Sequence, residues 1–319
     1  MTDSAQKVIA FPRARSPGPG KSKARKVIAI GGGKGGVGKS LVSANLALAL
    51  AGRGAKVVLV DGDLGGANLH TCLGVGQPSV CLSDFIDKRI ARLEDAIVSG
   101  GVEGLGLIAG AHDGLDAANP KHAQKVRLVK HLRGLDVDYV ILDLGAGTTF
   151  NVLDLYLAAD IGLVVLLPEP TSIENAYRFI KAAFFRKVNR TAAPSVSQAL
   201  SLVLSGRDPS ARAPWDLVTR LRTHDPAGAT QLELLLGGFH PMLVINQART
   251  RADHDVGPTV AAAWKKFFGL ELGYLGAVSH DEEVWKAVRA RQALITAAPA
   301  SAAALGLVRL AENLLALDR

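Results

Sequence analysis

Cysteine is nearly absent from this 319-residue chain. The two that occur, Cys72 and Cys81, stand nine residues apart and form no C-x-x-C pair. Two such residues cannot build a disulfide framework, and their spacing argues against the paired-cysteine sites that hold zinc or iron–sulfur clusters. A reducing compartment, the cytoplasm, is therefore expected.

The chain also lacks a long apolar run. No stretch reaches the ~18 apolar residues that a membrane-spanning helix needs, and the N-terminus shows no apolar core of a secretory signal. Aromatic residues make up only 5% of the sequence, but 48% of it is hydrophobic and 21% is charged, which is typical of a globular protein. We expect one domain, over residues 27–319, with additions.

Acidic residues are scarce at the N-terminus. In residues 1–26, seven lysines and arginines stand against Asp3 alone, which accounts for six of the eight net positive charges of the chain. Prolines and glycines between positions 12 and 20 disfavour regular structure. We predict that residues 1–26 form a disordered basic tail, with contact to nucleic acid or anionic lipid as the open alternative.

The most informative segment that is present is GKGGVGKS, residues 33–40. It follows the apolar run 27–30 and precedes the helical stretch 41–51, and its spacing fits G-x-x-x-x-G-K-[ST], a phosphate-binding loop. Glycines let backbone N–H groups approach phosphate oxygens, and the next helix adds the positive end of its dipole. Lys39 is expected at the β- and γ-phosphates of ATP, and Ser40 on Mg²⁺.

A second lysine, Lys34, lies inside the same loop. The string from Lys34 to Ser40 resembles the deviant Walker A loop of the MinD/ParA ATPases. In that family the first lysine crosses a dimer interface to the ATP of the opposite subunit, so the resemblance implies this role for Lys34 and a homodimer that forms on ATP binding. It implies nucleotide contacts for Gly33, Lys34, Gly35, Gly36, Val37, Gly38, Lys39, Ser40 and Leu41.

Two further apolar runs end in aspartate: residues 56–60 lead to Asp61 and Asp63, and residues 139–142 lead to Asp143. The carboxyl ends of parallel strands share one edge of a sheet, where ligands bind. Carboxylates at that edge favour water activation or magnesium placement, and ordinary turn residues are the alternative. Asp143 matches the Walker B arrangement, which holds Mg²⁺ through a water.

The family resemblance extends to these loops. The segment DGDLGGAN, residues 61–68, resembles switch I of the MinD branch, which makes Asp63 the catalytic residue and Asp61 a supporting or magnesium-water partner. Together with PEPTS, residues 168–172, it looks most like the flagellar-number branch, FlhG. Asn246 closes the apolar run 242–245, where the family reads adenine; an ordinary turn residue is the alternative.

Three other segments carry structural predictions. Residues 82–98 have helical periodicity, and residues 191–240 are expected to form an inserted helical subdomain. Residues 302–317 form an amphipathic helix. Because its polar face is not rich in lysine and arginine and it carries no Trp or Phe, packing in the core is favoured over anchoring in a membrane.

The whole pattern predicts an α/β fold with a doubly wound, mainly parallel sheet and helices on both faces. By resemblance it is a slow, partner-stimulated ATPase of the cytoplasm, with ATP and Mg²⁺ as cofactors and Lys34, Lys39 and Asp63 in catalysis. It would position or count a cellular structure such as a flagellum. Alternatives are a partition ATPase on nucleoid DNA and an ATP-dependent metabolic enzyme. A protein activator is expected. Whether this protein is located at a membrane surface or on DNA stays open.

Overall fold

The computed structural model describes residues 26–66, 68–111, 120–208, 211 and 213–317. They form one eight-stranded sheet in the order β3-β4-β2-β5-β1-β6-β7-β8, in which neighbours run parallel except the antiparallel pair β3 and β4. The doubly wound, mainly parallel sheet predicted from the sequence is confirmed. The strands are β1 (Lys26–Gly31), β2 (Val57–Asp61), β3 (Val98–Ser99), β4 (Leu105–Ile108), β5 (Tyr139–Asp143), β6 (Ile161–Leu166), β7 (Met242–Ala248) and β8 (Gly273–Ser279).

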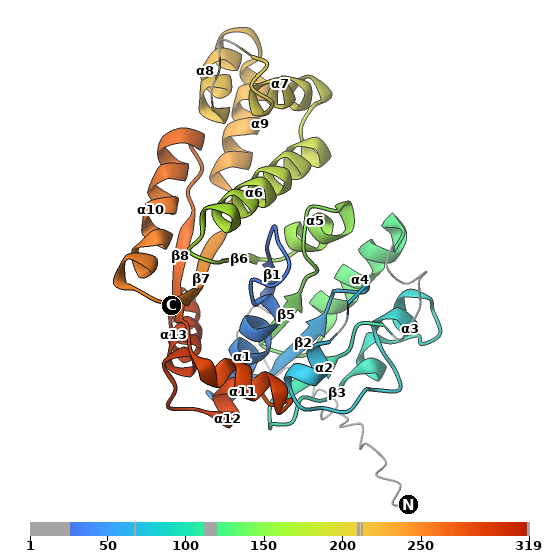
Figure 1. Ribbon diagram of the computed structural model, residues 1–319. Helices are drawn as coiled ribbons and strands as arrows, with labels where there is room; N and C mark the ends of the chain where they lie inside the picture. The colour runs from blue at the N-terminus through green and yellow to red at the C-terminus, as the bar shows by residue number, and fades with distance from the viewer. Residues whose placement is uncertain (1–25, 67, 112–119, 209–210, 212, 318–319) are drawn as a thin grey trace, which may run out of the picture.

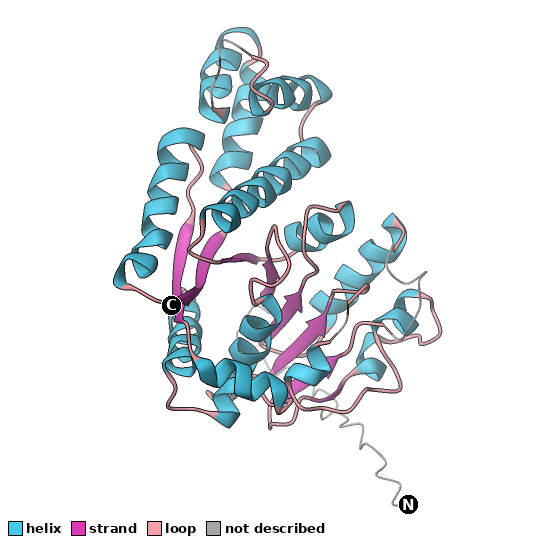
Figure 2. Cartoon of the chain, viewed as in Figure 1, coloured by secondary structure: helices cyan, strands magenta, loops and turns pink. Residues whose placement is uncertain are grey.

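Helices cover both faces of the sheet (Figure 2). They are α1 (Lys39–Ala51), α2 (Leu69–Cys72), α3 (Leu82–Ile86), the 3-10 helix η1 (Leu93–Ala96), α4 (His122–Gly134), α5 (Phe150–Leu157), α6 (Pro170–Thr191), α7 (Pro194–Leu204), α8 (Pro214–His224), α9 (Pro226–Gly237), α10 (Arg251–Phe268), α11 (Glu282–Arg289), α12 (Leu294–Ala297) and α13 (Ala302–Ala316). One core lies under α1, α2 and α11–α13, and the other under α3–α10.

The central strands are apolar throughout because both of their faces are buried. Along β1, Val27 and Ala29 point into the core under α3–α10, while Ile28 and Ile30 point into the core under α1 and α13. The same alternation holds along β2. Such a strand reads in the sequence as a continuous hydrophobic run, which is why these strands could be predicted.

Between α6 and β7 the chain forms the helices α7, α8 and α9, in agreement with the helical character expected for residues 191–240. Figure 1 shows them beyond α6, in yellow, at the far end of the molecule from α11 and α12. Their interpretation as an inserted subdomain stays a prediction. The expected basic tail lies outside the described residues apart from Lys26, which pairs with Tyr139 as the first residue of β1.

The prediction of helix over residues 82–98 is wrong for most of this range. Helix α3 ends after Ile86, and η1 and β3 follow it. Lys88 adopts a left-handed backbone, with a φ of 63°, and its N–H donates to the Phe85 carbonyl while the Arg89 N–H donates to the Asp84 carbonyl. This is the hydrogen-bond pattern of a Schellman helix end, which normally uses glycine at the position of Lys88.

Helix α13 packs in the core, as the sequence analysis favoured. It lies against β8 and α1, and its buried side is formed by Ala303, Ala304, Gly306, Leu307, Leu310, Ala311 and Leu314. Of the helices that the structure describes, each is too short or too polar to cross a bilayer.

We therefore expect Leu310→Ala to lower the free energy of unfolding by about 2–5 kcal/mol, because it leaves a cavity where a leucine that is 1% exposed now packs. Leu317→Ala is the matched control: Leu317 follows the same helix and is 52% exposed, so its loss should cost less than about 0.5 kcal/mol. Urea unfolding of both variants measures the difference. Equal values would show that α13 does not pack in the core in solution.

Candidate functional site

The phosphate-binding loop predicted from the sequence connects β1 to α1. Two of its residues require glycine: Gly36 and Gly38 have φ values of 77° and 91°, which disfavour other residues. The side-chain amide of Asn246, two residues before the end of β7, donates to the Val37 carbonyl over 2.8 Å. An added Cβ at Gly38 would lie 2.2 Å from that amide nitrogen. The loop is thus fixed from outside by a residue that lies far along the chain.

A second element that shapes the loop is α6. An added Cβ at Gly33 would lie only 2.0 Å from the carbonyl oxygen of Asn175, so the loop backbone rests directly on this helix. By contrast, nothing lies within 4 Å of a Cβ at Gly35. The neighbouring Lys34 is exposed. One side of the loop is therefore packed, and the side that carries Lys34 faces outward.

Lys39, the first residue of α1, is buried, with 9% of its surface exposed. Burial lowers the pKa of its ammonium group, while the nearby carboxylates of Asp143 and Asp63 act in the opposite direction. The two predicted catalytic groups Lys39 and Asp63 are therefore near each other, together with the predicted metal ligand Asp143. The lysine is in place to neutralise negative charge that arrives at the loop.

Asp61 and Asp143 end the neighbouring strands β2 and β5 in direct register. Both carboxyl groups are almost fully buried, and burial raises the pKa of Asp61 to about 7 and that of Asp143 to about 6. Two buried carboxylates in adjacent strands repel each other, and each raises the free energy of the other's charged form. A cation at this edge of the sheet would relieve both costs.

The oxygen atoms around Asp143 suit Mg²⁺. The side chains of Ser40 and Ser43 hydrogen-bond to the Asp143 carboxylate, with a distance of 2.8 Å from Ser43 Oγ to Asp143 Oδ1. Magnesium prefers such oxygen donors and usually keeps several waters, so it is bound by few protein groups. The residues present therefore fit Mg²⁺.

The carboxylate of Asp61 has a different use in the structure. It accepts hydrogen bonds from the backbone N–H groups of Asp63 and Leu69, over 3.2 and 3.0 Å. These contacts fix the loop between β2 and α2. Its predicted role toward the metal is untested, and its observed contacts are those of a residue that positions Asp63.

Asp63 belongs to the loop predicted as switch I, and its carboxylate lies close to the loop that follows β5. An added Cβ at Gly145, just after β5, would lie 3.1 Å from Asp63 Oδ1, and one at Gly66 would lie 3.4 Å from Oδ2. Glycines on both sides leave space around the carboxylate. The Asp63 carboxylate is thus flanked by glycines of two loops.

Sequence reasoning missed two positions of this site. Ser43 lies one helical turn after Lys39 and accompanies it on the same face of α1, so the four-residue spacing could have revealed it. Asn175 carries no such signal, because its contact with the loop is made by its backbone. The predicted contacts of Leu41 with nucleotide, and of Asn246 with adenine, stay predictions.

Comparisons with known proteins agree with this geometry. The family model described as "ParA: NUBPL iron-transfer P-loop NTPase" matches residues 23–203, more than half of the chain. The chain is 30% identical over 290 residues to the antiactivator FleN of Pseudomonas aeruginosa, a match that covers 90% of this chain and 85% of FleN. It is 36% identical over 159 residues to the flagellum site-determining protein YlxH of Helicobacter pylori, covering 49% of this chain and 53% of YlxH.

Among solved structures, the septum site-determining protein MinD of Pyrococcus horikoshii, in complex with Mg-ADP, superposes with a TM-score of 0.63. The match covers 92% of this chain and 99% of that one at 23% sequence identity, which is evidence for the fold alone. The resemblance to the MinD/ParA ATPases is confirmed by these matches, and the two flagellar relatives agree with the flagellar branch inferred from the motifs.

The contact between Gly33 and α6 gives a direct test of the site's geometry. We expect Gly33→Ala to lower the free energy of unfolding of the nucleotide-free protein by about 1–3 kcal/mol, because its Cβ would collide with the Asn175 carbonyl. Gly35→Ala, two residues on, meets open space and should change it by less than about 0.5 kcal/mol. Urea unfolding compares the two, and equal losses would mean that the loop does not rest on α6.

Proposed function

This chain belongs to the ParA family of P-loop NTPases, and on that premise we propose that it is an ATP-driven switch that dimerises when ATP binds and separates after hydrolysis. The observation that carries the proposal is the different burial of the two lysines in the loop. Lys39 is buried beside Asp63 and Asp143, whereas Lys34 on the same loop is exposed. A buried lysine serves the bound phosphates, and an exposed one is free to reach a second subunit.

Each residue of the site then has a defined part in hydrolysis. The loop N–H groups and the N-terminus of α1 bind the β- and γ-phosphates, with Lys39 as the internal cation. Bound Mg²⁺ would neutralise charge on those phosphates. Ser40 and Asp143 supply oxygen donors for the metal, and Asp63 accepts a hydrogen bond from the attacking water and orients it. Asp61 holds the Asp63 backbone in place.

Hydrolysis changes what the switch loops contact. With the γ-phosphate present, the segments that start at Asp63 and Asp143 have a charged group to order around, and after its release that group is gone. The output of such a cycle is the lifetime of a dimer and its location, so turnover is expected to be slow. The flagellar relatives support a role in placing or counting a flagellum, and a division site is the related alternative.

The dimer is tested by light scattering after size exclusion in saturating ATP and Mg²⁺. Asp63→Ala, which should slow hydrolysis by about 100-fold, is expected to form a stable dimer. Adding Lys34→Ala should return it to the monomer, because the cation that crosses to the second ATP is lost. Lys130→Ala, an exposed lysine on α4, is the control and should leave the dimer intact. A monomeric Asp63→Ala protein, or a dimer that tolerates Lys34→Ala, would refute the switch.

The target of the dimer is proposed to be a protein. The name of the relative FleN, an antiactivator, supports this, and so does the main apolar face of α13, which is buried against β8 and α1. We expect the Asp63→Ala dimer to stay in the supernatant when centrifuged with anionic liposomes or with DNA. Pelleting with liposomes would mean that the target is a membrane surface instead of a protein. Pelleting with DNA would favour a partition ATPase. Removal of residues 1–25 tells whether the basic tail is responsible.

A further inference from the structure

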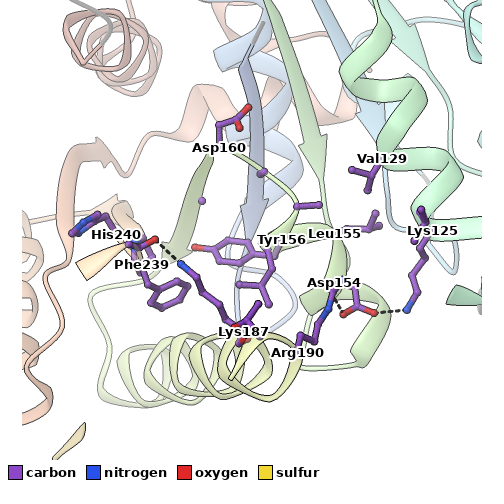
Figure 3. A pocket seen from close by; sticks show the side chains of 18 of the residues that line it. Lys125, Val129, Asp154, Leu155, Tyr156, Asp160, Lys187, Arg190, Phe239 and His240 are labelled. Carbon is purple, nitrogen blue, oxygen red and sulfur yellow. Dashed lines mark hydrogen bonds and ion pairs between the residues drawn. The ribbon is translucent and has the colours of Figure 1, made fainter. Parts of the chain in front are cut away.

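A cavity of about 470 Å³ lies at the amino ends of β6 and β7. It is lined by α4, the end of α5, the last turns of α6 and residues 238–241 (Figure 3). The phosphate-binding loop follows the carboxyl end of β1, which runs parallel to β6, so the cavity and the ATP site lie at opposite edges of the sheet. Its volume falls within the roughly 300–1,000 Å³ of small-molecule sites, and its occupant is not the nucleotide.

The charged groups of the cavity have a positive surplus. Asp154, on α5, is buried and is contacted by Lys125 from α4 and by Arg186 and Arg190 from α6. Three cations therefore surround one carboxylate. Asp160 is engaged elsewhere, since its oxygens accept from the Val27 N–H and from Arg133.

Arg190 is the most exposed member of this group, with 43% of its side chain exposed, and its contact with Asp154 is the longest, at 3.2 Å. Lys187, one turn earlier on α6, donates to the Gly238 carbonyl and lies over the ring of Phe239. Since Lys125 and Arg186 already neutralise Asp154, the guanidinium of Arg190 can accept a second anionic partner.

The second observation is a buried hydroxyl without a partner. Tyr156 is 3% exposed, and its hydroxyl finds no hydrogen bond among the residues that the structure describes. Figure 3 shows the ring in the middle of the lining residues, with its hydroxyl directed toward the side of Lys187 and Phe239. A buried donor without an acceptor raises the free energy of the folded protein, so this position favours a bound acceptor.

Apolar side chains complete the walls. Val126 and Val129 come from α4, Leu157 from α5, and Phe239 and Pro241 from the segment before β7. An apolar cavity with a few convergent polar groups is the usual form of a small-molecule site. We propose that this cavity binds a small organic anion with an apolar body, whose anionic head pairs with Arg190 and whose oxygen accepts from the Tyr156 hydroxyl.

Decanoate is a suitable probe, and isothermal titration calorimetry on the full chain measures its binding. We expect saturable binding at one site that added ATP and Mg²⁺ do not displace, and no binding of decylamine, which has the same body and the opposite charge. Arg190→Gln should weaken the affinity by about 10-fold. Arg222→Gln removes the same charge from an arginine that pairs with Glu233 outside the cavity, and should leave it unchanged.

The variant Tyr156→Phe tests whether the Tyr156 hydroxyl binds the ligand or stabilises the fold. Because the hydroxyl has no partner in the described structure, its removal should leave the melting temperature of the free protein within about 2 °C or raise it, while the affinity for decanoate falls several-fold. The proposal is overturned if decanoate does not bind at millimolar concentration, if ATP displaces it, if decylamine binds equally well, or if Arg190→Gln binds like the wild type. A lower melting temperature with unchanged affinity in Tyr156→Phe would also overturn it.

Discussion

Burial of ionisable groups at the carboxyl edge of the sheet is the constraint on which this structure depends. Asp61 and Asp143 end adjacent strands, both are buried, and the pKa of each carboxyl group is raised by burial. Lys39 is the cation that the chain itself places among them, and burial lowers its own pKa. An edge built in this way gains from an added cation, and a polyphosphate that arrives with the cation neutralises the loop's partial positive charges. Nucleotide and metal binding therefore complete a site whose charges the protein alone does not balance.

The two loops around this edge are held with different strength. The phosphate-binding loop is fixed by Asn246 on one side and by the backbone of Asn175 on the other. The loop that carries Asp63 is fixed mainly through hydrogen bonds to the Asp61 carboxylate, and glycines surround the Asp63 side chain. The loop proposed to bind the phosphates is thus held on two sides, and the less constrained loop carries the residue proposed to orient water. Helix α6 contacts the first loop near its start and lines the cavity near its end, so one helix belongs to both sites.

The sequence predicted what depends on local pattern. The buried strands, the loop at residues 33–40 and the aspartates at strand ends follow from apolar runs, glycine spacing and the shared edge of parallel strands. It did not predict the end of α3 at Lys88, because a lysine there adopts a backbone that glycine usually takes. It also missed the clamp between Asn246 and Val37, which joins residues 209 positions apart, and the cavity around Tyr156. These features arise where distant elements meet, and no periodicity within one segment records them.

That long-range clamp bears on the order in which the protein becomes competent during synthesis. The loop proposed to bind phosphate is synthesised before the amide that fixes Val37, which follows 209 residues later. The middle of α1 contacts still later residues, since the Asn45 side chain accepts from the N–H of Ile295. A nascent chain that ends within α7 already contains the whole phosphate-binding motif and lacks both supports. Both supports are therefore added to the finished loop and helix only after β7 and the residues up to Ile295 have been synthesised.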